Sequence, residues 1–593
     1  MPQPIPPSDH YRQRLQAREL YIKRLETIHI RLGYLRLLLV ASLVGLTWIY
    51  LRSHTLLAIW LSVPVLLFIA VAVFHAKVLE LQANAQRGAE FYRQGLARIA
   101  DDWKNIGARG ERFDVSNHLY AADLDLFGHG SLFQLLSMAR TRMGEDTLAN
   151  WLLNPSPLDT IRLRHQAIVD LRERLDFREA MAISSQSSSP AVHPDPLTSW
   201  AQAPLQLPSR PMRWIALLLS LLLVAASIHW ISTGVRAPFL LILLLEGILV
   251  LTHRARVNAV LHQTEHALAD LKLISSLLAR IEAEKFESAP LRDLKDRLCV
   301  HHVAASKAIA RLDTIGQYIQ SLENPLMRLI DIPFLYSVQV AFAADAWRRQ
   351  FGAIVPVWLV ELGEMEALLS LANYSFERPE DPFPTVVSGP SHFHAQHLGH
   401  PLIPASRCVR NDLTLDSSQR VVLVSGSNMS GKSTLMRSVG INTVLAMAGV
   451  PVRARALELT PLHVGASILV NDSLQKGASR FYAEITRLRH ILDLASGQPP
   501  LLFLLDELLQ GTNSRDRLIG ADGVLRALLE TSAIGLISTH DLALTSLRSD
   551  ALHNMHFQDQ IEDGKMKFDY ILHPGPVTRS NGVELMRLIG LDV

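Results

Sequence analysis

A glycine-containing loop that follows an apolar run carries the clearest chemistry in this 593-residue chain. The run Val421 to Val424 leads into Gly-Ser-Asn-Met-Ser-Gly-Lys-Ser, an order that predicts a strand, a tight loop and a helix. In such a loop the backbone N–H groups point at phosphates, the lysine neutralises phosphate charge and the last hydroxyl binds magnesium. The loop therefore predicts a site for a nucleoside triphosphate and Mg²⁺, made of Gly426, Ser427, Asn428, Met429, Ser430, Gly431, Lys432, Ser433 and Thr434.

Two further apolar runs end in residues suited to hydrolysis of a bound nucleotide. The run Leu501 to Leu505 ends in Asp506 and Glu507. The first carboxylate is expected to hold the magnesium shell, and the second to polarise the attacking water as the catalytic base. The run Ala533 to Ile537 is followed by His540, which we expect to sense the γ-phosphate. A histidine in an ordinary turn at the end of a strand is the alternative.

The same runs predict the elements that position these residues. Short, continuously apolar strands are typical of a parallel sheet that helices cover on both faces. Residues 381–593 are therefore expected to form an α/β domain with a mostly parallel sheet. Upstream, Leu271, Ile274 and Leu278 have helical spacing, so residues 253–380 are expected to be a helical lever region, with one or two long helices over 254–322. A further helix over 347–372 is expected to dock under the α/β domain.

The C-terminal part of the chain resembles the ATPase domain of MutS mismatch-repair proteins. This resemblance extends from Leu398 to Leu591, and a weaker one, to the opening of the MutS core domain, covers residues 123–136 and 144–153. The stronger match is carried by His400-Pro401, Asn411-Asp412-Leu413, Asn428-Met429, Ser479 with Phe481 and Glu484, Gly511-Thr512 with Ser514 and Asp516, Pro574-Gly575, Ser580 with Gly582, and Gly590-Leu591.

The resemblance implies ATP as the nucleotide, Mg²⁺ as its metal, hydrolysis as the reaction and a homodimer as the assembly. In this family a signature segment of one subunit reaches the γ-phosphate held by the other, which implies that role for Ser479. DNA is also implied as a partner, in mismatch repair or recombination. The net charge of only +2 gives no independent sign of polyanion binding, so DNA binding rests on the resemblance alone.

Several departures from the MutS pattern limit what the resemblance implies. No mismatch-recognition domain is expected before the core region, and Phe91 lacks the glutamate that supports the family's intercalating phenylalanine. Arg480 stands where the family has threonine, and Leu509-Gln510 replaces Gly-Arg. Because the chain stops at Val593, we expect no C-terminal helix-turn-helix to support a dimer.

Four apolar runs predict two transmembrane hairpins. The composition, with 49% hydrophobic and 19% charged residues, is unusual for a soluble ATPase. The runs cover residues 37–51 and 55–74 in the first pair, and 214–231 and 237–251 in the second. A helix needs about 20 apolar residues to cross a bilayer. Buried hairpins in a soluble core are the alternative, but such helices are usually amphipathic and these runs are apolar on every side.

Basic residues predict the orientation of the hairpins. Lysine and arginine concentrate on the cytoplasmic side of membrane spans. Both termini and the ATPase domain are therefore expected in the cytoplasm, in a multi-pass protein of the inner membrane without a cleavable signal peptide. Arg52 and Arg236, in the outer turns, are a contrary signal. The flanking basic residues are Arg12, Arg14, Arg18, Lys23, Arg24, Arg31, Lys77, Arg87, Arg210, Arg213, Arg254 and Arg256.

Three other residue types have weaker implications. Glu246 is the one acid well inside a predicted span, which makes it a functional candidate, with shielding by hairpin or dimer contacts as the alternative. Cys299 and Cys408 fit a reducing cytoplasm and predict neither a disulfide nor a metal site. The 24 histidines have no acidic or cysteine partners at ligand spacing, so they are expected to be solvated loop residues.

The leading interpretation is a membrane-anchored, MutS-like ATPase whose cycle drives conformational change. One alternative is a transporter of the ABC class, although no L-S-G-G-Q-type segment lies between Lys432 and Asp506. Another is a membrane scaffold that ATP switches without DNA binding. The predicted division is a basic N-terminal segment (1–36), a first transmembrane hairpin (37–76), a MutS core-like helical region (77–183), a Ser/Pro-rich linker (184–211), a second hairpin (212–252), the lever region (253–380) and the P-loop ATPase domain (381–593).

Overall fold

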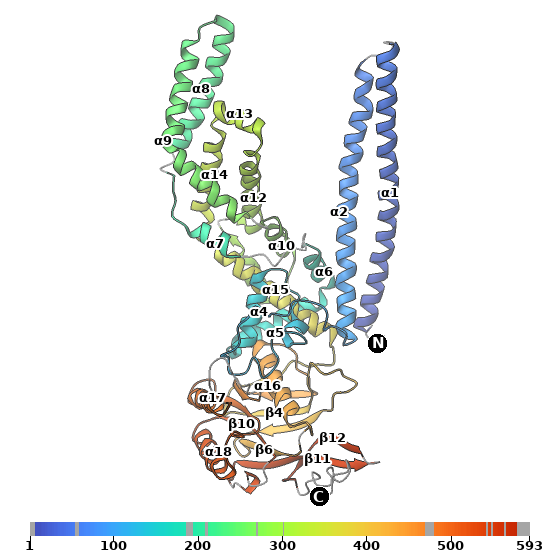
Figure 1. Cartoon of the computed structure of the whole chain (residues 1–593), viewed down its shortest axis with the longest axis vertical. Coiled ribbons are helices and arrows are strands. Elements are labelled where there is room, and N and C mark those ends of the chain that lie inside the picture. The colour runs from blue at the N-terminus through green and yellow to red at the C-terminus, as the bar shows by residue number, and fades with distance from the viewer. Residues whose placement is uncertain are drawn as a thin grey trace.

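Two helical arms and a C-terminal α/β domain make up the computed structural model of the chain (Figure 1). The arms diverge from a helical centre, and the α/β domain lies on the opposite side of that centre. The structure describes residues 6–53, 58–184, 194–207, 211–268, 271–300, 302–427, 429–468, 480–540, 544–546, 549–562 and 565–577.

The first arm is one antiparallel pair of long helices. α1 (Pro7–Ser53) and α2 (Ser62–Ile99) contain 47 and 38 residues. At a rise of 1.5 Å per residue these helices are about 70 and 57 Å long. A 3₁₀ turn, η1 (Ala58–Leu61), precedes α2. The domain boundaries expected after residues 36 and 76 therefore fall inside continuous helices, because the basic N-terminal segment is the first part of α1 and the core-like region begins within α2.

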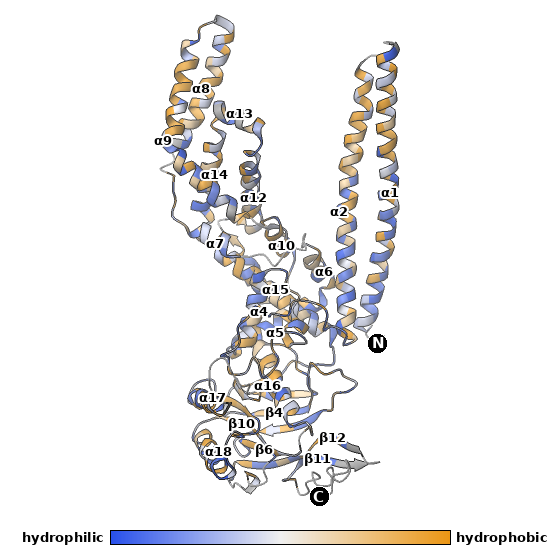
Figure 2. Cartoon of the chain, viewed as in Figure 1, coloured by the Kyte–Doolittle hydropathy of each residue, from blue (hydrophilic) through white to orange (hydrophobic). Residues whose placement is uncertain are grey.

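Within the described part of the chain, four helices are long and apolar enough to cross a membrane: α1, α2, α8 (Pro211–Thr233) and α9 (Ala237–Ala267). Between 6% and 17% of their apolar windows is buried. Figure 2 shows hydrophobic residues around the outer parts of both arms, and hydrophilic residues on the inner part of the first arm. A soluble helical hairpin usually buries its apolar stripe, whereas the apolar windows of these four helices are largely exposed.

The base of the first arm docks on the centre of the molecule. Tyr11, Phe91 and Tyr92 form a buried aromatic cluster there. Beside it, Arg98 of α2 donates two hydrogen bonds of 2.7 and 2.6 Å to Glu377, the last residue of α15 (Val355–Glu377). Phe91 is 1% exposed, so its ring is part of this docking contact and does not project outward as a wedge.

The second arm is wider because further helices pack on α8 and α9. These helices are α12 (Ala305–Ser321), α13 (Pro325–Phe334) and α14 (Tyr336–Phe351). A buried cluster joins Ala216 of α8 and Val257 of α9 to Leu335 and Phe342 at and within α14.

Glu246 lies inside the second arm. It is 1% exposed, and neither carboxylate oxygen has a hydrogen-bond partner among the described residues. Its burial agrees with shielding by the hairpin, which was the alternative to a functional role.

The centre is a helical core around α15. α15 packs against α4 and α5, and α16 of the α/β domain packs against the same two helices. The helix expected over 347–372 is thus the end of α14 followed by α15, which approaches the α/β domain through α4 and α5. The other central helices are α3 (Leu132–Leu136), α4 (Arg142–Leu153), α5 (Leu158–Glu173), α6 (Leu175–Ile183), α10 (Leu271–Ala283) and α11 (Ala289–Arg297).

The expectation of one or two long helices over residues 254–322 was wrong. The stretch 254–322 holds the end of α9, then α10, α11, a short hairpin of β1 (Cys299–Val300) and β2 (Val303–Ala304), and α12, in place of one or two long helices. A proline in the first turn of α11 prevents α10 from continuing through it. Within the Ser/Pro-rich linker expected over residues 184–211, α7 (Pro194–Gln202) buries Trp200 in the main core. A large buried side chain anchors this segment.

The α/β domain is built on a six-stranded sheet in the order β12-β11-β6-β10-β9-β8. All neighbouring pairs are parallel except β11 with β12. The expected mostly parallel sheet flanked by helices is therefore confirmed. Its strands are β6 (Val421–Ser425), β8 (His463–Ser467), β9 (Leu501–Leu505), β10 (Ile534–Thr539), β11 (Leu552–Glu562) and β12 (Lys565–Pro574).

Both faces of this sheet are covered, which explains why its central strands are apolar throughout. Along β6, Val422 and Val424 join the main core with α16 (Lys432–Ala448). The alternate residues Val421 and Leu423 join a second core with the other two helices. Those helices are α17 (Arg480–Ala495) and α18 (Ser514–Leu529). A four-stranded sheet that the sequence did not predict has the order β3-β7-β4-β5, with β3 (Thr385–Val386), β4 (Phe393–Leu398), β5 (Asn411–Leu415) and β7 (Ala456–Leu459).

Candidate nucleotide site

The glycine loop connects the end of β6 to the start of α16. Its conformation needs glycine at Gly431, where φ is +110° and an added Cβ would lie 3.2 Å from Cδ1 of Tyr570. Met429 also has positive φ, at +73°, and its side chain is 85% exposed. Asn428 lies outside the described residues. Left-handed residues of this kind are typical of loops whose backbone N–H groups bind a phosphate at the N-terminus of a helix.

Lys432 is held over this loop. Its Nζ donates hydrogen bonds of 2.8 Å to the carbonyl oxygens of both Gly426 and Ser427. Burial lowers the pKa of the Lys432 ammonium, although Glu507 and Asp506 act in the opposite direction. Negative charge close to Nζ therefore favours the charged form of Lys432. The hydroxyls of Ser427 and Ser430 are buried without a hydrogen-bond partner among the described residues, so the loop offers donors that fit a phosphate group.

Ser433, in the first turn of α16, lies next to Asp506, which directly follows β9. Ser433 Oγ donates a 2.5 Å hydrogen bond to Asp506 Oδ2. Ser538, at the end of β10, donates to the other carboxylate oxygen of Asp506. A hydroxyl beside a carboxylate is the oxygen donor set that P-loop proteins use for Mg²⁺, so these residues fit that ion. No cluster of three or more His, Cys, Asp or Glu side chains suggests another metal within the described part of the chain.

Glu507 lies next to Asp506 in a conformation that the surrounding contacts impose. Its φ is +50°, and a non-glycine residue there costs about 1–3 kcal/mol, which places it among strained residues typical of functional sites. Its backbone N–H donates to Ser538 Oγ at 3.2 Å. Its carboxylate lies 3.4 Å from His540 Nδ1 and accepts a hydrogen bond from the Gln510 side chain.

These contacts reveal two residues for which the sequence predicted no role. Ser538 bridges the side chain of Asp506 and the backbone of Glu507. Gln510, noted only as a departure from the MutS pattern, lies on the Glu507 carboxylate. Both lie in short segments whose chemistry depends on the turn after β9 and on strand pairing between β9 and β10. No linear sequence motif indicates either contact.

The segment expected to act on a partner subunit precedes α17. Ser479 itself lies outside the described residues. Glu484 of α17 is 5% exposed and accepts a 2.6 Å hydrogen bond from the backbone N–H of Leu509. The turn that carries Glu507 is thereby attached to the helix that follows the expected signature residue.

A cavity of about 360 Å³ lies beside the loop. Burial lowers the pKa of His400, one of its lining residues, to about 4, so its imidazole is neutral near pH 7. A neutral ring and two aromatic side chains are a suitable lining for a planar, uncharged base. The sequence did not predict this cavity, because its walls come from four segments. They are Leu398, His400, Ile403, Arg407, Cys408, Val409, Asn411, Gly431, Thr434, Leu435, Ser438, Phe557 and Tyr570.

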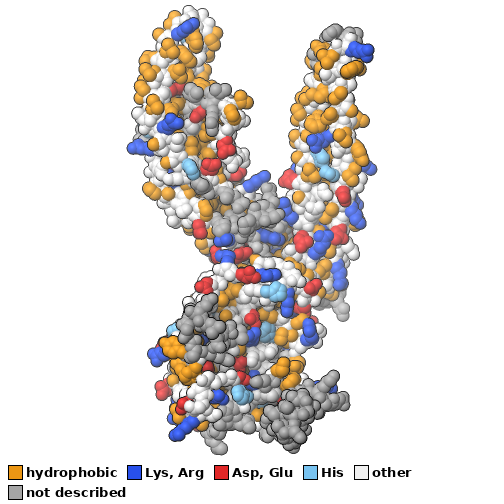
Figure 3. Space-filling view, viewed as in Figure 1, with side chains coloured by type: hydrophobic (Ala, Val, Ile, Leu, Met, Phe, Trp, Pro, Cys, Tyr) orange, Lys and Arg blue, Asp and Glu red, His pale blue; other side chains and the backbone are white. Residues whose placement is uncertain are grey.

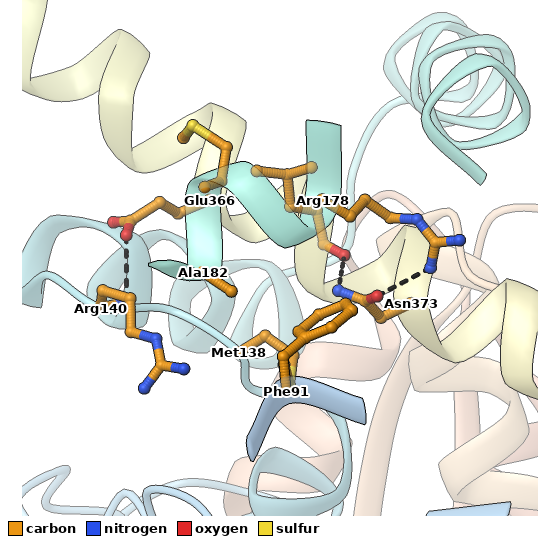
Figure 4. Close-up of a pocket in the computed structure, with 9 residues that line it drawn as sticks. Phe91, Met138, Arg140, Arg178, Ala182, Glu366 and Asn373 are labelled. Atoms are coloured by element: carbon orange, nitrogen blue, oxygen red, sulfur yellow. Dashed lines mark hydrogen bonds between the residues drawn. The ribbon is translucent and has the colours of Figure 1, made fainter. Parts of the chain in front are cut away.

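A second, smaller cavity lies where the first arm meets the centre (Figure 4). Its volume is about 20 Å³, which is room for one water molecule and not for a substrate. Figure 4 shows Glu366 beside the backbone of Arg140, and Arg178 beside Asn373. This cavity belongs to a packing junction, with Phe91 of α2 as one wall.

Glu366 predicts a pH dependence of stability. Burial raises its pKa to about 7, although Thr141 and the Arg140 N–H donate to it. A carboxyl with a higher pKa in the folded chain stabilises the fold below its unfolded pKa, and this contribution is lost as the pH rises through about 7. We expect the melting temperature of wild type, relative to Glu366→Gln, to fall between about pH 5 and pH 8. Equal slopes for the two proteins would contradict this, and Glu323→Gln, at an exposed position, is the control.

The site places the protein in a broad class. A glycine loop between a central strand and a helix, with an acidic pair at the end of the second strand along, defines P-loop nucleotide-binding proteins. Comparison with known families gives a more specific assignment for this part of the chain. Residues 422–592 match the family model described as MutS domain V. Residues 422–592 therefore form a MutS domain V, and in this part the chain is similar to proteins of the MutS family.

Curated relatives agree with this assignment. "DNA mismatch repair protein MutS 2" of Haloarcula marismortui is 39% identical over 201 residues, which is 33% of this chain and 21% of that protein. "DNA mismatch repair protein MutS" of Exiguobacterium sp. is 35% identical over 241 residues, 39% of this chain and 28% of the relative. The protein of the same name from Thermus thermophilus is 36% identical over 195 residues, 32% and 23% of the two chains. The chain thus spans less than a third of the length of these relatives.

Proposed function

We propose that this protein is a membrane-anchored ATPase of the MutS type, which hydrolyses ATP to rearrange its helical arms. The observation that carries the proposal is the convergence of Lys432, Ser433, Asp506 and Glu507 at one edge of the main sheet. These four residue types bind phosphate, hold a magnesium ion and activate water in P-loop enzymes. Their proximity requires α16, β9 and β10 to be correctly assembled, which an isolated motif does not ensure.

Each residue has a separate task in this proposal. The loop N–H groups and Lys432 bind the β- and γ-phosphates, and Ser433 with Asp506 holds Mg²⁺. When bound, Mg²⁺ neutralises the phosphate charge that develops during cleavage. Glu507 accepts the proton of the attacking water, while His540, which contacts the same carboxylate, responds to the γ-phosphate. The nucleoside occupies the cavity lined by His400, Phe557 and Tyr570.

A homodimer belongs to the same proposal. Large apolar side chains are exposed on the face of the α/β domain that carries α17 and α18: Tyr482 (65%), Ile485 (42%) and Ile519 (63%). Exposed apolar side chains close together are typical of protein interfaces. Ser479 would then contact the nucleotide of the other subunit, since it directly precedes α17.

Membrane anchoring by the two arms is the third part of the proposal. Leu37, Val44 and Leu66 on the first arm, and Leu221 and Leu241 on the second, are each at least 59% exposed. Figure 3 shows such hydrophobic side chains spread over both arms, with charged side chains concentrated nearer the centre. Exposing this much apolar surface to water is unfavourable, whereas the hydrocarbon core of a bilayer would cover it. The basic flanks support a cytoplasmic position for the ATPase domain, and the proposal puts the arms in the inner membrane.

A test of membrane topology uses inside-out and right-side-out vesicles from cells that express the full chain. We expect trypsin to remove the ATPase domain only in inside-out vesicles, and carbonate at high pH to leave the chain in the membrane fraction. Release by carbonate would contradict anchoring by the arms. Digestion in right-side-out vesicles would contradict the cytoplasmic orientation.

Action on DNA is proposed from the relatives, each of which is named as a DNA mismatch repair protein. The decisive experiment measures ATP hydrolysis by the detergent-purified chain with no DNA and with linear, mismatched and branched DNA. Lys432→Met serves as the inactive control. Stimulation by one DNA would support a DNA-processing role and identify the structure that is recognised. Hydrolysis that no DNA changes would contradict this role and leave the ATPase proposal standing.

A further inference from the structure

α13 is a short helix whose position differs from that of the membrane-spanning helices. Figure 1 shows it lying across the ends of α12 and α14, beside the second arm. It contacts both α8 and α14. Asn324 caps its first turn by accepting a 3.0 Å hydrogen bond from the N–H of Leu326. At its other end, Leu335 has left-handed backbone angles (φ +47°), which turn the chain sharply into α14.

Large apolar side chains on and beside α13 are exposed. Leu326 is 69% exposed and Phe334 is 47% exposed. Tyr318, near the end of α12, is 50% exposed, and its ring centroid lies 6.3 Å from that of Tyr336. A soluble tip of a helical arm would carry polar side chains here, because nothing among the described residues covers these groups.

The level of α13 along the arm indicates what covers them. Leu335, at the end of α13, belongs to the same buried cluster as Ala216 of α8 and Val257 of α9. Those two residues mark the inner end of the apolar part of the hairpin. Exposed side chains that prefer the lipid headgroup region lie within three residues of them along the chain: Arg213, Trp214, Arg254 and Arg256.

We propose that α13 is an interfacial helix, which lies in the cytoplasmic headgroup layer of the same bilayer that the second arm crosses. The lipid surface would cover the exposed apolar side chains of α13. These side chains continue the apolar surface of α8 at the level of the basic and tryptophan residues. A short helix across the membrane normal, with apolar residues on one side, is the geometry of interfacial helices. The helix would fix the depth and the tilt of the second arm relative to the ATPase domain. This inference rests on the proposed membrane anchoring.

The test uses the full chain with Cys299 and Cys408 replaced by serine, reconstituted in vesicles of phosphatidylcholine and phosphatidylglycerol. Single cysteines at Leu326, Ile228 and Leu163 carry an environment-sensitive fluorophore. Leu326→Cys probes α13, Ile228→Cys probes an exposed position within α8, and Leu163→Cys probes an exposed position on α5 in the helical centre. Lipids brominated near the headgroup or near the chain middle then quench the fluorophore according to depth.

We expect the Leu326→Cys label to lose fluorescence mainly with shallow bromine and the Ile228→Cys label mainly with deep bromine, while the Leu163→Cys label loses none. A Leu326→Cys label that neither bromolipid quenches would overturn the inference, provided that Ile228→Cys is quenched. If this label is also shielded from aqueous iodide, a second copy or another protein covers α13, which overturns the inference as well. Absence of quenching at both Leu326→Cys and Ile228→Cys would instead refute membrane anchoring, and with it the inference.

Discussion

Glutamine in place of Glu507 is expected to lower the rate of ATP hydrolysis by roughly 10²- to 10⁴-fold, the usual contribution of a general base. Glutamine retains the shape of the side chain but cannot accept the proton of water. Because Lys432, Ser433 and Asp506 are unchanged, ATP binding should persist, and the nucleotide should remain bound without cleavage. Phosphate release measures the first effect, and equilibrium binding of a fluorescent ATP analogue measures the second.

The matched control is Glu530→Gln, at an exposed position at the end of α18. It makes the same chemical change outside the site and should leave hydrolysis unaltered. Gln510→Ala tests the neighbouring contact, since Gln510 holds the Glu507 carboxylate in place. We expect a smaller loss of rate from this variant, as befits a positioning residue. Wild-type hydrolysis by Glu507→Gln would show that another group activates the water.

Alanine in place of Arg98 is expected to destabilise the attachment of the first arm by about 3–5 kcal/mol, because it leaves a buried carboxylate without its charge partner. The Arg98 and Glu377 side chains are only 8% and 3% exposed, and two hydrogen bonds join them. Tyr11 also donates to Glu377, at 3.3 Å, but a phenol does not replace a cation. Urea unfolding of the detergent-solubilised chain, followed by tryptophan fluorescence, measures the loss. Trypsin sensitivity of the connection after α2 reports whether the arm has detached.

Arg93→Ala is the control on the same helix. Arg93 pairs with Glu19 at 2.9 Å, but both side chains are about half exposed, so this exchange should cost less than about 1 kcal/mol. Replacing both charges, as Arg98→Met with Glu377→Leu, should recover much of the stability, because no buried charge is left unpaired. Equal stability of Arg98→Ala and Arg93→Ala would contradict a structural role for the buried pair.

The buried pair at Arg98 is one of several ion pairs along the route from the first arm to the nucleotide site. Arg378, the next residue after α15, donates to Asp101 at 3.0 Å. Asp381 then accepts a 3.0 Å hydrogen bond from Arg453, which leads into β7. The end of α15 is therefore attached to the arm on one side and to the α/β domain on the other. In the proposed function, movement of the ATPase domain would reach the arm through this connection.

The sequence alone determined the nucleotide-site motifs and the class of the C-terminal domain. The loop at residues 426–433, the acidic pair Asp506-Glu507 and the buried strands around them are local patterns, in which a short segment contains both its structure and its chemistry. The apolar runs of the arms are equally local, because the composition of a segment is enough to predict a helix without a polar face.

Only the tertiary structure decided which distant residues meet. Ser538 reaches Asp506 because β10 pairs with β9, and the cavity beside the loop exists because Tyr570 and His400 arrive from opposite ends of the domain. Trp200 lies in a segment of linker-like composition, yet burial in the main core holds it in α7. Likewise, no local pattern pairs Arg98 with Glu377, which are separated by 279 positions. Motifs depend on neighbours along the chain, whereas cavities, docking contacts and buried ion pairs depend on how long-range packing brings separate segments together.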